Sequence, residues 1–149
     1  MSLQIVRFAS AFFVALALAP ALAHVLELPN KIRLSREEYV AVQRLYRGWQ
    51  FVGVLVVGAL LSTGLLAVMA RDEPEHFVPA LVAFGAVALT QVIFWLFTFP
   101  VNRGTANWTS VPAEWERLRK RWEYSHAMSA VCNLVALAAV IVAILPPLS

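Results

Sequence analysis

The sequence predicts an all-α fold, namely a four-helix transmembrane bundle with helical cytoplasmic extensions. Three runs contain no Asp, Glu, Lys, Arg or His, and a fourth is interrupted only by His24: Phe51–Ala70, Phe77–Val101, Ala127–Ser149 and Phe8–Leu26. Each run has about the 20 residues that a helix needs to cross ~30 Å of hydrocarbon. Hydrophobic residues make up 60% of the chain and charged residues 14%, which is too little charge for a typical soluble domain.

We therefore expect a single membrane domain over residues 1–149, with spans at about 6–28, 49–70, 77–100 and 124–145. The first segment has an alternative reading as a signal peptide, because Arg7 precedes an apolar stretch and residues 21–23 have a small-x-small pattern. Removal of this segment would leave Lys31 and Arg33 on the translocated side of the membrane, against the usual distribution of basic residues. We therefore favour a retained span.

Basic residues predict the orientation. Ten of the 12 Lys and Arg residues fall in the first and third loops or at their edges. These loops are expected in the cytoplasm and both termini outside, as in a bacterial inner-membrane protein. The basic residues lie beside the spans, which favours contact with the lipid bilayer and not with nucleic acid.

Both basic loops carry helical signals. Ser35 and Glu38 form a capping-box pattern, which predicts a helix running through Gln43 and Tyr46 into the second span. Pro112 suits the first turn of another helix that continues into the fourth span. Residues 101–110 are expected to be irregular.

Helical spacing gathers polar side chains onto faces of three spans, and topology places several of these faces at the cytoplasmic ends. The residues are His24 and Glu27 on the first span, Gln91, Trp95, Asn102 and Arg103 on or after the third, and His126 and Asn133 on the fourth. Polar groups facing lipid are costly, so these faces should point inward. The sequence thus predicts a pocket in the cytoplasmic half, with Gln91, Trp95 and Asn133 at its floor.

Three chemistries are open to such a pocket. His24, Glu27 and His126 have the composition of a two-histidine, one-carboxylate iron site, and the two histidines alone could ligate haem. The single cysteine, Cys132, excludes a Cys-rich metal site. We favour chemistry without a metal or cofactor, in which His24 or His126 is the base, Glu27 orients it, and Asn102 with Arg103 stabilises an anion. Aromatic walls would suit a flat, hydrophobic small molecule.

Part of the chain resembles a known family. The segment Phe99-Pro100-Val101-Asn102, the run from Trp115 to Trp122 and then His126 resemble the DUF1772, or anthrone oxygenase-like, family of four-span membrane proteins. The first span, which ends in His24-Val25-Leu26-Glu27, is similar too. The resemblance implies a four-span membrane fold, and for some members the cofactor-independent oxidation of anthrones to anthraquinones. It places Asn102, Arg121, Trp122 and His126 at the family's polar motif positions.

A non-enzymatic role is the alternative. Small residues recur four apart on the spans, as at Gly58 and Ser62, and such pairs allow close helix contact in lipid. The chain would then be a small membrane subunit that packs against a larger complex or another copy of itself. The polar residues would hold the bundle together, with Glu27, for example, simply pairing with Lys31, Arg33 or Arg103.

Overall fold

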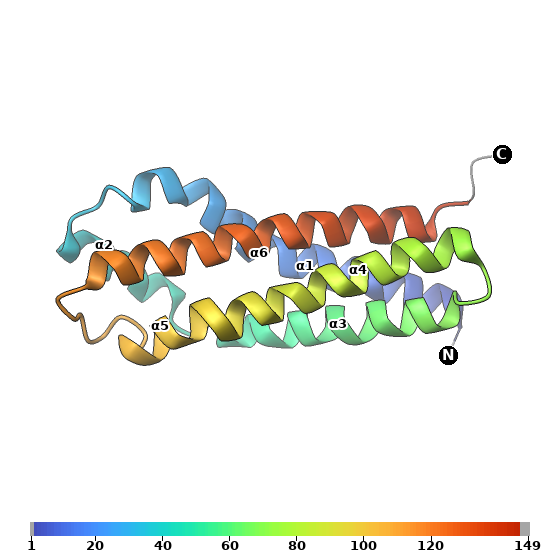
Figure 1. The fold of residues 1–149 in the computed structure, drawn as a ribbon, viewed down its shortest axis with the longest axis horizontal. Coiled ribbons are helices and arrows are strands. Elements are labelled where there is room, and N and C mark those ends of the chain that lie inside the picture. The colour runs from blue at the N-terminus through green and yellow to red at the C-terminus, as the bar shows by residue number, and fades with distance from the viewer. Residues whose placement is uncertain (1, 147–149) are drawn as a thin grey trace.

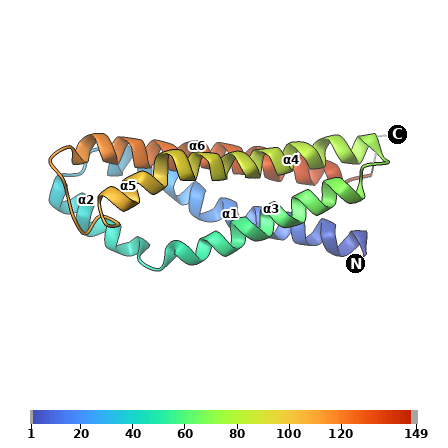
Figure 2. The same ribbon diagram turned by 60° about the horizontal axis from the view of Figure 1, so that its bottom comes forward.

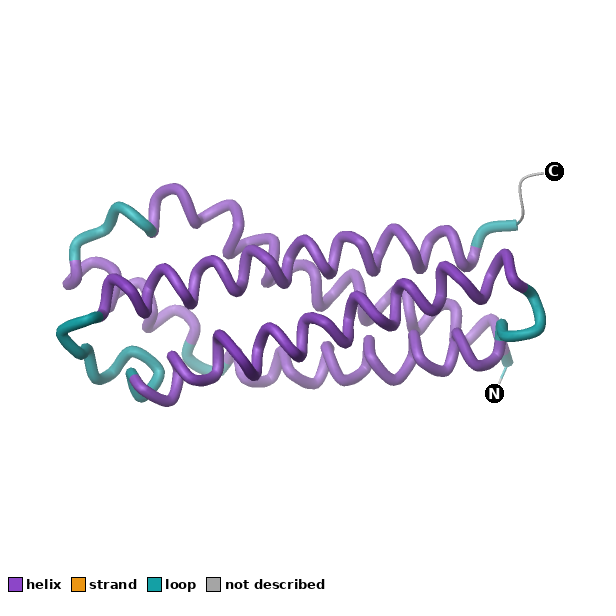
Figure 3. The backbone as a smooth tube through the Cα atoms, in the orientation of Figure 1, coloured by secondary structure: helices purple, strands orange, loops and turns teal. Residues whose placement is uncertain are grey.

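The computed structural model describes residues 2–146 and is an antiparallel bundle of four long helices (Figure 1). The helices are α1 (Leu3–Lys31), α2 (Arg36–Gln43), α3 (Val52–Met69), α4 (Pro74–Ile93), α5 (Phe99–Gly104) and α6 (Trp115–Ile144). Residues 2–146 contain no strand (Figure 3). The all-α prediction is confirmed.

Four helical stretches are long and apolar enough to cross a membrane: Leu3–Lys31, Trp49–Met69, Pro74–Gly104 and Trp115–Ile144. Their outward faces carry large apolar side chains, such as Phe8 (69% exposed) and Phe51 (73%), which in water would form an unfavourable surface. The protein is therefore an integral membrane protein. The second stretch agrees with the expected 49–70, whereas the other three begin earlier or end later than expected, because the polar residues at their ends continue the same helical turns.

The bundle has a simple packing order. α1 packs on α3 and α6, and α4 packs on the same two helices, so α1 and α4 lie diagonally across the bundle (Figures 1 and 2). Small and β-branched side chains fill the centre, with Val14, Ala59, Ala83, Val87 and Ala136 all completely buried. Small residues let helices approach closely where lipid supplies no hydrophobic drive for association.

Gly58 marks one such close approach. A Cβ atom at this position would lie 2.6 Å from Cδ1 of Phe13, on the facing helix α1. Only glycine fits here without displacement of the Phe13 ring.

The first and last turns of the described helices, in α1 and α6, lie at one end of the bundle, and the basic loops lie at the other, which we call the basic end (Figure 1). The predicted capping box is present there: Ser35 Oγ accepts from the Glu38 amide, and Glu38 Oε2 accepts from the Ser35 amide. The expectation that this helix continues into the second span is wrong. It ends at Gln43, and two 3₁₀ turns (Arg44–Tyr46 and Trp49–Phe51) flank Gly48, whose φ of 90° no helix can accommodate.

The third span is continuous but not uniformly α-helical. A π-helical turn, Phe94–Thr98, joins α4 to α5. Such a turn contains one extra residue, so it changes which side chains face inward. Thr98 points into the bundle and bonds Ser125 of α6 at 2.7 Å, whereas Trp95 is 58% exposed. The expected stripe of Gln91, Trp95 and Asn102 on one face is therefore broken at Trp95.

The loop after α5 contains three consecutive residues with positive φ: Ala106 (46°), Asn107 (54°) and Trp108 (62°). This conformation costs about 1–3 kcal/mol for each residue that is not glycine. Local hydrogen bonds offset part of that cost, since Thr105 Oγ1 accepts from the Trp108 amide at 3.1 Å and Asn102 O accepts from the Asn107 amide at 2.7 Å. α6 begins at Trp115, so Pro112 precedes the helix and does not lie in its first turn as expected. The helix then runs unbroken through the fourth span, as predicted.

Candidate functional site

Eight side chains from different parts of the chain meet at the basic end, and we call them the polar cluster. They are His24, Glu27 and Lys31 of α1, Tyr39 of α2, Tyr46 of the following turn, and Trp122, Glu123 and His126 of α6. The spacing of three and seven residues puts the α1 members on one face, and the same periodicity aligns those of α6. Because α1 packs on α6, the two faces meet.

Lys31 is the centre of this cluster. Its Nζ lies 3.0 Å from Glu123 Oε1, 3.0 Å from the Tyr46 hydroxyl, 3.3 Å from His24 Nδ1 and 3.5 Å from Glu27 Oε2. The Lys31 side chain is only 4% exposed and that of Glu123 is fully buried, whereas that of Glu27 is 45% exposed. Glu27 therefore forms the outer edge of the cluster and Glu123 its inner wall. The positive charge of the ammonium compensates the negative charges of the two carboxylates, which would otherwise be costly in a membrane protein.

Two phenols donate to these carboxylates, whereas Glu123 Oε2 is buried without a partner in the described chain. Tyr39 donates to Glu123 Oε1 at 2.9 Å, and Tyr46 donates to Glu27 Oε2. Burial, followed by the charge of Glu123, raises the pKa of Tyr39. Burial, followed by the hydrogen bond to Glu27, raises the pKa of Tyr46. Both hydroxyls therefore stay protonated donors at neutral pH.

Arg119 adds a second buried cation near the cluster. Its Nη1 donates to the Leu34 carbonyl at 2.7 Å, and its guanidinium lies 4.5 Å from the Trp115 ring centroid. It lies one helical turn before Glu123 on α6. With Lys31 it balances the charges of Glu27 and Glu123, so the group as a whole is close to neutral.

The two histidines lie against each other. The ring centroids of His24 and His126 are 4.3 Å apart and the planes are 26° from parallel, while Trp122 contacts both rings edge-on. An ammonium can only donate, so His24 Nδ1 accepts from Lys31 and the proton of neutral His24 resides on Nε2. His126 Nε2 is buried and has no hydrogen-bond partner among residues 2–146. The pair therefore contains one fixed imidazole and one with an unused nitrogen.

The other residues expected at the site lie in different settings. Asn102 accepts a 2.8 Å hydrogen bond from Trp122 Nε1, which holds the indole beside the histidines. Arg103 is exposed, and its side chain is not part of the cluster. Gln91 is half-buried and bonds Thr90, whereas Asn133 is 4% exposed with an unbonded Oδ1. Trp95 points outward because of the π-helical turn.

Sequence reasoning missed four members of the cluster: Lys31, Tyr39, Tyr46 and Glu123. Lys31 was expected in the first basic loop, as one of three pairing partners of Glu27, and that ion pair is present at 3.5 Å. Tyr46 was expected only as part of the helix that begins after Ser35. One signal was available, since Glu123 precedes His126 by three residues and Lys31 follows His24 by seven, which places each on the face of its histidine. The folding back of α2, which brings in Tyr39, has no comparable signal.

The geometry bears on the iron and haem alternatives. In the described part of the chain, no group of three or more His, Cys, Asp and Glu side chains is placed to hold a metal ion. Lys31 Nζ lies within 3.5 Å of both His24 and Glu27. Its positive charge therefore occupies the place of a metal ion bound by these two residues. Stacked rings 4.3 Å apart also leave no room for a haem plane between them.

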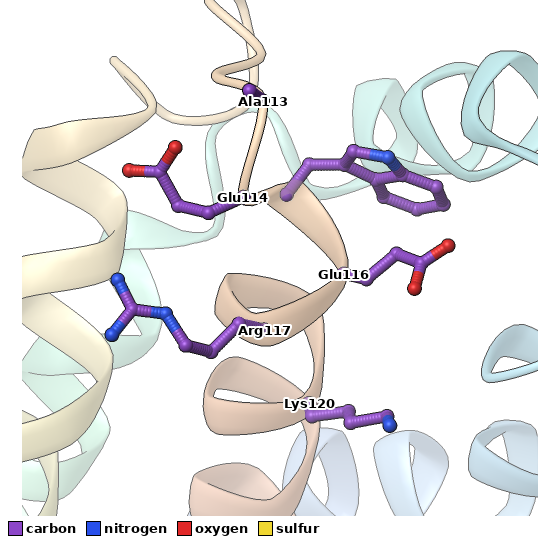
Figure 4. Close-up of a pocket in the computed structure, with 6 residues that line it drawn as sticks. Ala113, Glu114, Glu116, Arg117 and Lys120 are labelled. Carbon is purple, nitrogen blue, oxygen red and sulfur yellow. The ribbon is translucent and has the colours of Figure 1, made fainter.

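Two cavities at the basic end lie outside the polar cluster. The larger, about 480 Å³, follows the first turns of α6 and is lined by residues 113–117 and Lys120. Its charged side chains point to different sides of the helix, as with Glu114 and Glu116 (Figure 4). They converge on no common point, so this surface does not form a second reactive site.

The chain was also compared with known proteins. No family model, no curated protein and no solved structure matches it. The resemblance to the anthrone oxygenase-like family therefore stays a prediction from the residues that carry it.

Proposed function

We propose that this protein is an oxygenase-like membrane enzyme that removes a proton from a hydrophobic aromatic substrate of the anthrone type, without a cofactor. The observation that supports the proposal is the His24–His126 pair. One imidazole is fixed by Lys31, and the other has a buried, unbonded nitrogen. A neutral imidazole whose nitrogen has no hydrogen-bond partner can serve as a general base.

The first step is proton abstraction. His126 Nε2 takes a proton from the methylene carbon opposite the substrate carbonyl, and the electron pair moves onto the carbonyl oxygen as an enolate. Lys31 lies beside the pair and can stabilise this negative charge, which gives it the role expected of Arg103. The rings of Trp49 and Trp122 contact His24, and a flat substrate would stack against these rings.

The second step uses molecular oxygen. The carbanion adds to dioxygen and, with one proton, gives a hydroperoxide, which then loses water to form the quinone. One anthrone and one dioxygen thus give one anthraquinone and one water. The proton held by His126 returns in the hydroperoxide, so the base is regenerated.

The test is to supply an anthrone to the purified protein in detergent and to follow quinone absorbance and oxygen uptake above the rate of spontaneous oxidation. We expect His126→Ala to lower the rate by about 100-fold or more, in line with the loss of a general base. His76→Ala is the matched control, because His76 is the third histidine and lies at the opposite end, where Nδ1 bonds Ala143 O at 2.9 Å. Wild-type rates in both His24→Ala and His126→Ala would show that neither histidine is the base.

The basic end would face the cytoplasm of a bacterial cell, with both termini outside the inner membrane. Ten of the 12 basic residues at one end support this orientation. A Cys132→Ala background with single cysteines at Ser2 or Arg33 allows labelling with an impermeant maleimide in intact cells. We expect labelling of the cysteine at position 2 and not of the cysteine at position 33. The reverse pattern would show that the protein has the opposite orientation in the membrane.

A non-enzymatic subunit is the second candidate. Four large apolar side chains project outward beside the π-helical turn, namely Trp95 (58% exposed), Leu96 (57%), Phe97 (47%) and Phe99 (38%). This surface would suit another membrane helix as well as lipid. Crosslinking from Trp95 in native membranes distinguishes the two, because a specific protein adduct favours the subunit and lipid adducts alone favour the enzyme.

A further inference from the structure

A second cavity at the basic end lies outside the spans and apart from the polar cluster. It has a volume of about 150 Å³ and lies between the end of α2 and the loop after α5. Its lining residues are Val40, Gln43, Arg44, Arg47, Asn107, Trp108 and Thr109. Figures 1 and 2 show that α2 and α5 reach the same end of the bundle.

Two residues that line the cavity carry buried N–H groups with no acceptor. Trp108 is 3% exposed and Gln43 is 6% exposed, and neither Trp108 Nε1 nor Gln43 Nε2 has a hydrogen-bond partner in the described structure. An indole nitrogen can only donate, so the Trp108 N–H is a buried donor without an acceptor in the described chain. Leaving such a donor unpaired is costly, and native proteins rarely do so without a reason.

The charge of the lining indicates what the acceptor is. Arg44 and Arg47 supply two positive charges, and no Asp or Glu is among the lining residues. Neither arginine forms an ion pair within residues 2–146. Asn107 and Thr109 add further polar groups, so donors of several kinds surround one small space.

The loop that holds Trp108 is itself strained. The positive φ of Ala106, Asn107 and Trp108 places two lining residues on one side of the cavity. Backbone strain of this kind tends to occur where a ligand is held. The strain is consistent with the cavity and does not by itself define it.

We propose that this cavity binds a phosphate group, presented either by the headgroup of an anionic membrane lipid or by a small soluble phosphate compound. Arginine binds phosphate oxygens through two parallel hydrogen bonds, and the Trp108 ring lies in the wall beside the two arginines. The volume corresponds to about five waters at roughly 30 Å³ each, which accommodates a phosphate with some of its hydration. This site is independent of the proposed catalysis.

The experiment follows the indole of Trp108 directly. Protein labelled with nitrogen-15 tryptophan contains five indole groups, and the signal missing from Trp108→Phe identifies Trp108. The protein is placed in phosphatidylcholine nanodiscs and titrated with inorganic phosphate, with sodium chloride of equal ionic strength as the reference. A second sample uses nanodiscs that contain phosphatidylglycerol and no added phosphate.

A shift of the Trp108 signal with inorganic phosphate identifies a soluble phosphate ligand, and a shift only with phosphatidylglycerol identifies a lipid headgroup. Arg44→Gln/Arg47→Gln should weaken either interaction at least tenfold, since hydrogen bonds to charged groups contribute strongly. The matched control, Arg33→Gln/Arg117→Gln, removes the same charge from two exposed arginines that do not line this cavity, and should change affinity by about twofold at most. An unchanged signal in both samples, an equal shift with chloride, or an equal loss in the control variant would overturn the proposal.

Discussion

The Lys31 ammonium lies 3.0 Å from Glu123 Oε1, and the two side chains are 4% and 0% exposed. This ion pair joins the last residue of α1 to the middle of the polar face of α6. A buried pair of this kind does not necessarily stabilise a fold more than apolar residues would, but the loss of one partner is costly because the other charge stays buried. The pair therefore fixes how the two histidine-bearing helices meet.

Replacement of Lys31 by methionine should destabilise the protein by about 3–5 kcal/mol, because Glu123 would be left as an uncompensated buried charge. The double variant Lys31→Met/Glu123→Leu should recover most of that loss. The measurement is the free energy of unfolding in mixed micelles under increasing denaturing detergent. Lys120→Met, on the exposed side of α6, is the control, and an equal loss there would contradict the special role of Lys31.

Stability should fall in alkaline solution because of Tyr39 and Tyr46. Both phenols have a raised pKa in the folded protein, so the folded state keeps protons that the unfolded state releases above about pH 10. Their contribution is complete below that pH and is lost as pH rises above it, by up to about 1.4 kcal/mol per pH unit for each phenol.

Unfolding measured from pH 8 to 11.5 checks this expectation. Tyr39→Phe/Tyr46→Phe should be less stable at pH 8 but should show a shallower decline above pH 10. An identical slope in the wild type and the double variant would mean that other groups control alkaline unfolding. Tyr124→Phe, at an exposed tyrosine, is the control for loss of a hydroxyl.

Gly58→Ala should destabilise the bundle by about 1–3 kcal/mol, the usual cost of overpacking. The new Cβ would meet the Phe13 ring at 2.6–2.8 Å, so α1 and α3 would have to separate or the ring would have to move. Gly53→Ala is the matched control on the same helix, because its Cβ would have no atom within 4 Å. That control should be neutral or slightly stabilising, and equal effects of the two substitutions would contradict the close approach at Gly58.

The sequence predicted the bundle because apolar runs of span length are a strong and local signal. It also brought His24 and His126 to one end, since the charge bias and the alternation of spans leave few other arrangements. The π-helical turn at Phe94–Thr98 could not be anticipated from a regular 3.6-residue period, so Trp95 was expected inside. Lys31 was assigned to a loop because the apolar run ends before it. Hydropathy gives no sign that α1 continues as far as Lys31 or that the Lys31 side chain faces the interior of the bundle.

Stability and activity, measured together, distinguish a catalytic from a structural role of His126. Its buried Nε2 has no partner in the described chain, so His126→Leu should stabilise the fold by about 1–2 kcal/mol while it abolishes anthrone oxidation. His24→Leu should instead destabilise the protein, because it removes the acceptor from Lys31. The measurements are the thermal unfolding temperature and the turnover rate of each variant. A catalytic role of His126 predicts higher stability without activity in His126→Leu. A purely structural His126 would lose stability on substitution, as His24 does, and stability would then fall in both variants.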